Sequence, residues 1–312
     1  MKNKKSPVYL PLTHALAWIV ASTFLISGTS YLVLKHFLKS KRYVAKDFKY
    51  TITSILQTGP QKEALKTQYL AELLDISMDS PYSVFTFNLD KAKQRLLRSP
   101  LISRAEVKLI KPNTLYVDYT IRQPIVWLED YTNVVIDKEG YPFPFSPFFS
   151  PKNLPSIYFG LSPFGMEPMD LDRPAVFWGS PLKGKYVDLA FDILNLTTDP
   201  KISNFFSVKR IDISNAFAES YGTREIVILT EDSIIYNIDG KEMQFCFPRI
   251  LRLSTQDYAQ ELGNYLKLRE QLLLEEQKKL PVIPDKVEPI IRLKEKVIDL
   301  RIHKLAFIEE CT

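Results

Sequence analysis

The chain has 312 residues, of which 46% are hydrophobic and 25% are charged, so it is long enough for about two domains and too apolar to be disordered throughout. Its 41 basic and 36 acidic residues leave a net charge of only +5, without the clustered basic face that nucleic-acid binding requires. The two cysteines, Cys246 and Cys311, lie far apart and form no CxxC motif. This excludes a disulfide framework and leaves open whether the two thiols are bridged.

Residues 14–34 contain no formally charged side chain, and Trp18 and Tyr31 lie near the two ends, where aromatic rings favour the membrane interface. About 21 helical residues span roughly 31 Å, the thickness of a bilayer's hydrocarbon core. A cleaved signal peptide is the alternative, but its apolar region is shorter, about 7–15 residues. We therefore predict an uncleaved membrane helix at 14–34 after a short tail at 1–13. Lysines flank both ends, so charge alone does not set the orientation.

The segment 47–124 predicts the order strand, helix, helix, strand, strand. The second helix has Asn88 or Asp90 as its expected N-cap. Two alternating runs follow, at 102–109 and 115–121, and a Lys-Pro-Asn turn signal separates them. Two helices on one face of a three-stranded sheet would make a small α+β domain.

The segment 125–312 predicts a larger, mostly antiparallel β domain with flanking helices, so the fold class of the whole chain is α+β. Helices are expected at 185–196 and after a capping box that begins at Ser254. Strands are expected at 208–213, 224–229, 233–238 and 243–247, with Glu231-Asp232 as a solvated turn, and 295–308 is interpreted as one long strand. The Pro- and Phe-rich stretch 141–181 fits either a polyproline ligand or, as we favour, loops packed on a sheet.

The sequence contains no credible active site. Its three histidines, His14, His36 and His303, form no metal-binding spacing, and no phosphate-binding or nucleophile motif is present. A triad through His303 is a remote alternative. We expect no enzymatic activity, no cofactor, no metal and no small-molecule substrate.

The run from Ser99 to Val117 resembles the signature of a POTRA module, in which a helix ends at proline and two strands follow around a Pro-x-x-Leu turn. The stretch 122–140 and the run Val297–Ile302 resemble the FtsQ/DivIB family of bacterial division proteins. Ile302 departs from the pattern, because an aromatic residue is common there. The resemblance implies a cytoplasmic tail, one membrane helix, a POTRA domain at 47–124 and a β domain at 125–312.

The same resemblance implies a divisome scaffold at the septum of the inner membrane, with the N-terminus in the cytoplasm and the bulk of the chain outside it. Its partners would be bitopic proteins of the FtsB/FtsL type and other septal membrane proteins, through which it would control septal peptidoglycan synthesis. The alternatives are a POTRA-containing component of a translocation or secretion system and a membrane-anchored cell-wall enzyme.

The C-terminal run is the expected partner-binding strand, because a free strand edge can accept a partner strand. Lys294, Lys296, Arg301 and Lys304 would place positive charge along this edge and suit an acidic partner. The alternative is an interior strand with solubilising lysines. The residues predicted to bind a partner are Val297, Asp299, Arg301, Ile302, His303, Lys304 and Ala306.

Overall fold

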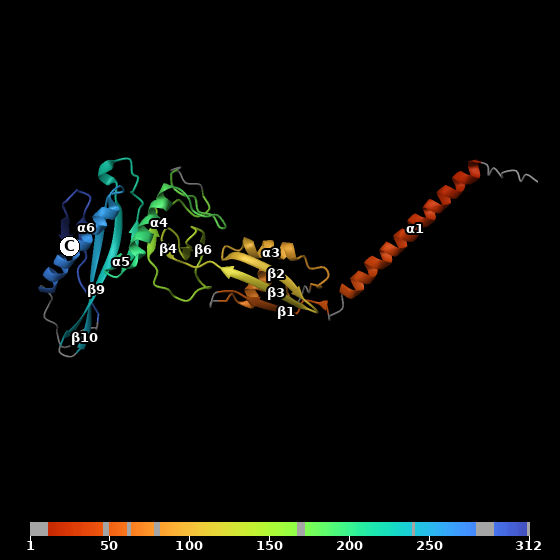
Figure 1. Cartoon of the computed structure of the whole chain (residues 1–312), viewed down its shortest axis with the longest axis horizontal. Helices are drawn as coiled ribbons and strands as arrows, with labels where there is room; N and C mark the ends of the chain where they lie inside the picture. The colour runs from red at the N-terminus through yellow and green to blue at the C-terminus, as the bar shows by residue number, and fades with distance from the viewer. Residues whose placement is uncertain are drawn as a thin grey trace, which may run out of the picture. The chain divides into compact units, whose positions relative to one another are not determined.

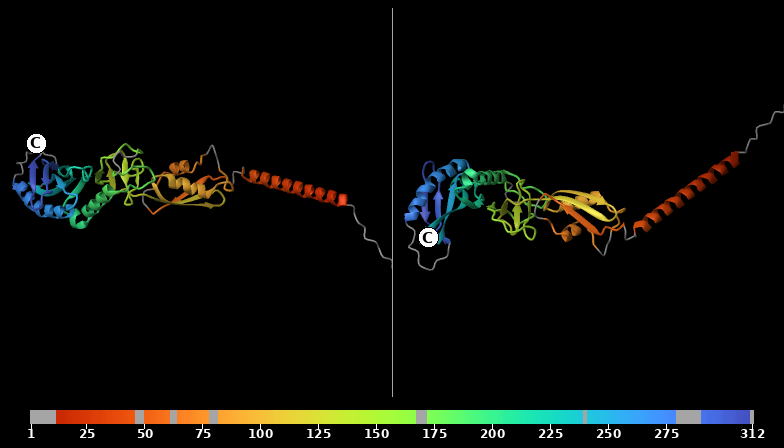
Figure 2. Two further views of the ribbon diagram at one scale, coloured as in Figure 1. Left: turned by 90° about the horizontal axis from the view of Figure 1, so that it is seen from above. Right: turned by 60° about the horizontal axis from the view of Figure 1, so that its bottom comes forward.

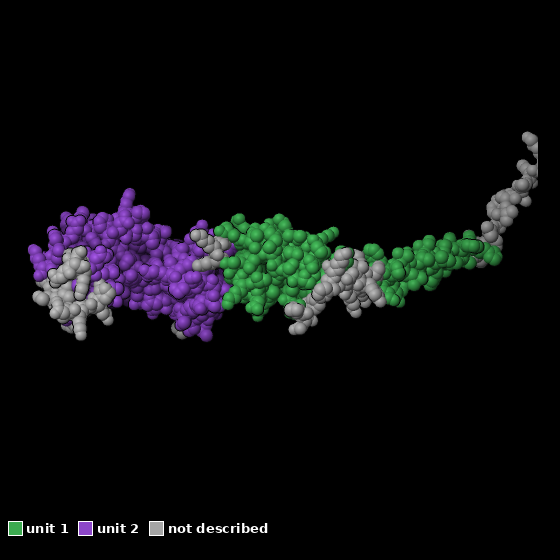
Figure 3. Space-filling view, turned by 90° about the horizontal axis from the view of Figure 1, so that it is seen from below, with its two compact units in different colours: residues 1–96, 104–119 green, residues 97–103, 120–312 purple. Residues whose placement is uncertain are grey.

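The computed structural model describes residues 12–45, 50–60, 64–77, 82–166, 172–238, 241–278 and 290–310. The chain divides into two compact units, residues 1–96 with 104–119 and residues 97–103 with 120–312 (Figure 3). Each unit is described by itself below. The predicted domain limits at 47–124 and 125–312 stay predictions.

The N-terminal helix α1 runs from Leu12 to Ala45 and is longer than predicted (Figure 1). Among the described residues it is the one helix long and apolar enough to cross a membrane, over His14–Lys39. Its hydroxyls need no outside partner, because Thr23 and Thr29 donate to carbonyl oxygens four residues earlier. This helix suggests a single-pass membrane protein.

The small sheet has the order β1-β3-β2, and the chain order β1, α2, α3, β2, β3 is the predicted one. Asn88 is the N-cap, because its side chain accepts the Lys91 N–H at 2.9 Å. Leu70, Leu96 and Val117 are among the fully buried residues of this small sheet and its two helices. The elements are β1 (Ser54–Thr58), α2 (Thr67–Leu73), α3 (Leu89–Arg98), β2 (Ile102–Ile110) and β3 (Thr114–Ile121).

The large sheet has the order β13-β12-β10-β9-β8-β7-β4-β5-β6, and β11 also pairs with β10. Its longest ladder is the antiparallel pair β9–β10. Its strands are β4 (Val126–Leu128), β5 (Val134–Ile136), β6 (Pro142–Pro144), β7 (Ser156–Tyr158), β8 (Ser207–Asp212), β9 (Ile226–Ile238), β10 (Lys241–Leu253), β11 (Ile290–Arg292), β12 (Lys296–Asp299) and β13 (Phe307–Glu310).

Three α-helices accompany this sheet: α4 (Lys185–Thr198), α5 (Pro200–Ser203) and α6 (Tyr258–Lys278). The predicted helix at 185–196 is confirmed, and Ser254 accepts the Asp257 N–H just before α6, as predicted. In Figures 1 and 2, α6 lies along β9 and β10. The Pro- and Phe-rich stretch packs as loops around the short strands β6 and β7, with Phe143, Phe145 and Phe149 buried. Residues 167–171 of that stretch lie outside the described residues.

The prediction of a turn at Glu231-Asp232 is wrong, because β9 runs unbroken through both residues. Asp232 is fully buried, and Arg269 Nε lies 2.7 Å from one of its carboxylate oxygens while Arg249 Nε lies 3.4 Å from the other. Two guanidinium groups from elsewhere in the chain therefore make a buried carboxylate tolerable in mid-strand.

The prediction of one long strand at 295–308 is also wrong. The strand β12 stops at Asp299, the chain turns, and β13 returns antiparallel to it with Asp299 opposite Phe307. On the other side, β12 pairs in parallel with β10. β12 is therefore an interior strand, and β13 is the edge of the sheet.

Candidate partner-binding site

The segment from Leu300 to Ala306 forms the turn between β12 and β13, called here the C-terminal turn. The Leu305 N–H donates to the Ile302 carbonyl at 3.0 Å, and Lys304 takes a positive φ of 63°. A residue in this left-handed conformation cannot continue a strand. The conformation of Lys304 therefore belongs to the reversal of chain direction that the sequence pattern did not reveal.

The predicted site residues fall in two places. Val297 and Asp299 lie in β12, between β10 and β13, and their backbone groups are not at an edge. The other five predicted residues, Arg301, Ile302, His303, Lys304 and Ala306, form most of the C-terminal turn. The edge strand itself, Phe307–Glu310, contains none of them.

The backbone register shows which groups of β13 point outward. The Leu300 N–H donates to the Arg252 carbonyl of β10 at 2.9 Å, so the even-numbered residues of β12 bond to β10 and the odd-numbered ones face β13. The odd-numbered residues Val297 and Asp299 of β12 pair with Glu309 and Phe307 of β13. The N–H groups of Ile308 and Glu310 therefore point away from the sheet. Among the described residues, β13 pairs with no strand other than β12.

The edge strand and the turn expose an unusual amount of apolar surface. Phe307 is 52% exposed, and Ile302, Leu305 and Ile308 are exposed to a similar degree. Large exposed apolar side chains that cluster in one place mark interaction surfaces. Free backbone donors with apolar side chains on both sides are the features that a partner strand uses when it extends a sheet.

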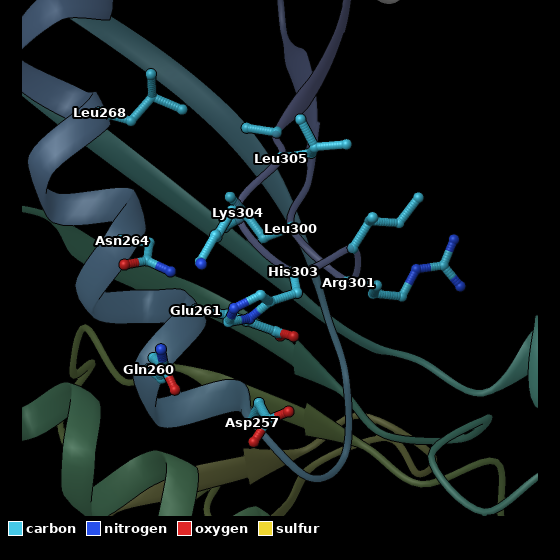
Figure 4. Close-up of a pocket in the computed structure, with 12 residues that line it drawn as sticks. Asp257, Gln260, Glu261, Asn264, Leu268, Leu300, Arg301, His303, Lys304 and Leu305 are labelled. Carbon is cyan, nitrogen blue, oxygen red and sulfur yellow. The ribbon is translucent and has the colours of Figure 1, made fainter.

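A groove of about 440 Å³ lies between the first half of α6 and the C-terminal turn. Figure 4 shows His303 and Lys304 extending toward α6, where Gln260 and Asn264 line the groove, whereas Arg301 points away from the helix. Glu261 is buried there, and its carboxylate accepts bonds from the Ser254 N–H and Oγ, both at 2.7 Å. Burial raises the pKa of Glu261.

The expected positive charge along the edge is largely neutralised. Arg301 Nη2 lies 2.6 Å from Asp299, and Lys296 Nζ lies 2.9 Å from Glu276 and 3.4 Å from Glu310. Burial alone would raise the pKa of Asp299, but hydrogen bonds from Arg301 outweigh it and lower that pKa. The strand that forms the edge is acidic, so the expectation of a basic edge is wrong. Of the four cations, Lys294 and Lys304 form no ion pair with any described residue, whereas Lys296 and Arg301 do.

Comparison with known families gives one finding. A family model for the FtsQ-type POTRA domain matches residues 61–118, which contain α2, α3, β2 and most of β3. Together with the apolar helix α1, this match confirms the resemblance seen in the sequence. The chain therefore contains an FtsQ-type POTRA domain, and this domain together with α1 supports a relation to the FtsQ/DivIB family. No curated protein matches the chain.

The match to the FtsQ-type POTRA domain covers residues 61–118, whereas the candidate site lies near the C-terminus. Sequence reasoning missed Phe307 and Ile308 because it treated the last strand as continuous. The Lys-Leu-Ala step before them, with no Gly, Pro or Asn, gives no turn signal. The apolar pair directly before two glutamates was the one sequence feature that could have located the edge.

The described residues show few side-chain arrangements that could support catalysis. They contain no cluster of three or more His, Cys, Asp or Glu side chains that could hold a metal ion. Cys246 carries a buried free thiol, and Cys311 lies outside the described residues, so the bridge left open by the sequence is not tested. His303 lies in the exposed C-terminal turn rather than on a strand. The absence of enzymatic activity stays a prediction.

Proposed function

We propose that this protein is a divisome scaffold that binds bitopic membrane partners of the FtsB/FtsL type by adding a partner strand to β13. The single observation that supports this most is the outward direction of the Ile308 and Glu310 N–H groups beside exposed Phe307 and Ile308. A partner strand would pair with these backbone groups and cover the apolar side chains.

The groove beside the turn extends this surface. A partner segment that continues past β13 toward the C-terminal turn would reach the groove between α6 and the turn. Several of the residues predicted from sequence line this groove, and His303 and Lys304, which extend toward α6 (Figure 4), would contact the partner segment there. Val297, Asp299 and Arg301 would act indirectly, by holding β13 and the turn in place.

The membrane anchor allows a partner to bind through an interface of modest affinity. Partners confined to the same membrane meet at a raised effective concentration, so a short strand pairing can give a stable complex. We propose that the N-terminus is cytoplasmic, that the remainder lies outside the inner membrane at the septum, and that the POTRA domain recruits other septal membrane proteins. In this role the protein controls septal peptidoglycan synthesis by assembly, without a catalytic step of its own.

Two proline substitutions in the full-length chain test the site. Ile308→Pro removes an outward N–H, which an edge strand tolerates, and should abolish partner binding while the fold persists. Glu309→Pro removes an N–H that bonds to β12 and should instead destabilise the C-terminal part of the sheet. Ile308→Thr keeps both the N–H and the β-branch and serves as the control for side-chain loss.

The measurement is co-purification from native membranes in mild detergent, with the partners identified by mass spectrometry. We expect small single-span proteins with wild type and Ile308→Thr, and their loss with Ile308→Pro. Unfolded outer-membrane barrel proteins in place of single-span partners would favour the translocation alternative. Full partner recovery by a folded Ile308→Pro protein would show that the interface lies elsewhere.

A further inference from the structure

Inside the large sheet, the far end of β9 also has one edge that pairs with no strand of the described part of the chain. The strand β8 accompanies β9 only as far as the pair Ser207–Glu231, and Ser207 Oγ donates to the Glu231 carbonyl at that point. From Asp232 to Ile238, β9 continues alongside β10 (Figure 1). Among the described residues, no strand pairs with this part of β9 on its other side.

The direction of the backbone groups follows from the neighbouring strands. The Ile213 N–H donates to the Tyr158 carbonyl of β7 at 3.0 Å, so the even-numbered residues of β8 face β9, with Arg210 opposite Leu229. The odd-numbered residues of β9 therefore present their N–H and C=O groups to β8. Beyond Glu231 the same alternation directs the groups of Ser233, Ile235 and Asn237 outward, where no strand of the described part of the chain receives them.

The base of this part of the hairpin packs against α6. Phe245 and Phe247 of β10 are buried with Leu273 of α6, and Ile234 of β9 packs against this small core. On the opposite side of β10, β11 extends the sheet at the same level, with Phe245 opposite Ile291. The edge of β9 around Ile234 is therefore supported by its neighbours, which lowers the ordering cost for a strand that pairs there.

The edge carries none of the features by which proteins discourage pairing. The residues from Ser233 to Ile238 include no charge and no proline, although a quarter of the whole chain is charged. Natural edge strands are usually blunted by lysine, proline or a bulge. Ile235 is 64% exposed, so an apolar side chain stands on an open, uncharged strand edge.

We propose that this edge, β9 from Ser233 to Asn237, pairs antiparallel with the same segment of a second copy of this chain. A two-fold axis at Ile235 places Ile235 opposite Ile235, Ser233 opposite Asn237 and Ile234 opposite Tyr236. By residue type in the sequence, each cross-strand pair then matches polar with polar, or apolar with apolar or aromatic. No like charges are brought together in this register. A surface that pairs with its own copy must satisfy this condition, and a charged edge does not.

The second copy is favoured over a foreign strand because the segment is complementary to itself in this register. Two anchored copies also share one membrane, and confinement raises their effective concentration. The contact is independent of the β13 edge, so the protein can hold a second copy through β9 and a partner strand through β13.

The test uses the full-length chain in native membranes and places charges on the two-fold axis. Ile235→Lys puts two ammonium groups opposite each other, and Ile235→Asp does the same with carboxylates. We expect each variant alone to lose self-association by about tenfold or more, because like charges directly opposite are destabilising. Coexpressed with different affinity tags, the Lys and Asp variants should recover it as a mixed dimer.

A cross-linking experiment locates the axis. In a Cys311→Ser background, Ile235→Cys should form a covalent dimer on mild oxidation, because paired residues of antiparallel strands have close Cβ atoms. Leu274→Cys on α6, at a position where the native side chain is 59% exposed, is the control for random collision. Equal cross-linking of both variants, a wild-type chain that is monomeric at every membrane density, or failure of the mixed pair to associate would each overturn the proposal.

Discussion

Two clusters of ion pairs in the C-terminal part of the large sheet use the same residue types in opposite surroundings. The inner cluster lies between α6 and the sheet and joins Arg249, Arg269 and Lys296 to Asp232 and Glu276, with exposed Glu310 of β13 at its margin. The outer cluster lies at the C-terminal turn and joins Arg252 and Arg301 to Glu225 and Asp299. Each contains as many cations as anions.

Solvation is what separates the two clusters. Asp232 and Arg249 have side chains 0% and 1% exposed, whereas those of Asp299 and Arg252 are 21% and 39% exposed. A buried charge that loses its partner cannot be compensated by water, and an exposed one can. The inner cluster therefore fixes α6 on the sheet, and the outer cluster holds the shape of the turn. Breaking an ion pair of the outer cluster should cost less free energy of unfolding than breaking one of the inner cluster.

Removing the central carboxylate of the inner cluster should have the largest effect. Asp232→Asn keeps the side-chain shape but leaves Arg269 without its carboxylate and Arg249 with Glu276 alone, so we expect a loss of about 3–5 kcal/mol in the free energy of unfolding. Chemical denaturation of the full-length chain, followed by the fluorescence of Trp127 and Trp178, measures it.

The double variant Asp232→Asn, Arg269→Gln is the matched control, because it removes one charge of each sign. Its loss should be smaller than the sum of the two single losses, by about 0.5–3 kcal/mol. A loss below about 1 kcal/mol for Asp232→Asn alone would mean that water reaches this cluster, and the contrast between the two clusters would fail.

Neutralising the outer cluster should have an intermediate, pH-dependent effect. The pKa of Asp299 is lowered in the folded protein, so the ionised carboxylate stabilises the fold. This contribution to the free energy of unfolding is fully present above the unfolded pKa of about 3.9 and is lost as the pH falls through the pKa of the folded protein. We expect Asp299→Asn to lower stability by about 1 kcal/mol at pH 7, discounted for partial exposure. The difference from wild type should shrink steadily below about pH 4.

Unfolding curves of wild type and Asp299→Asn at pH 7, 5, 4 and 3 check this expectation. A difference that stays constant across the series would show that the carboxylate acts through packing rather than through its charge. Asp257→Asn, at an exposed position near the same turn, controls for a general effect of acidic residues.

The free charges of the site should have the smallest effect on stability. Lys304→Glu and Glu309→Gln alter exposed residues outside both clusters, so we expect changes within about 0.5 kcal/mol. Thermal unfolding of the full-length chain measures both. A large loss for either variant would show that the turn or the edge strand depends on an ion pair that these substitutions break.

The sequence by itself determined the elements whose signals are local. The uncharged run from His14 to Leu34 predicted the membrane helix, and alternation at 102–109 and 115–121 predicted β2 and β3 of the POTRA domain. The Asn88 cap, the helix at 185–196 and the Ser254 cap were predicted for the same reason. In each case, residues a few positions apart fix the structure, so no distant partner is needed.

The tertiary structure decided the features that depend on distant partners. Glu231-Asp232 looks like a turn in the sequence, and only Arg249 and Arg269 make it part of a strand. The C-terminal run looks continuous, and only the pairing of β12 on both sides turns it into an interior strand with β13 as its edge. Of the seven residues predicted to bind a partner, the fold puts five in the C-terminal turn and two in the interior strand β12, and their role in binding stays a prediction. The free energy of a buried charge or a strand edge depends on which groups fold against it, and a pattern of neighbouring residues does not contain that information.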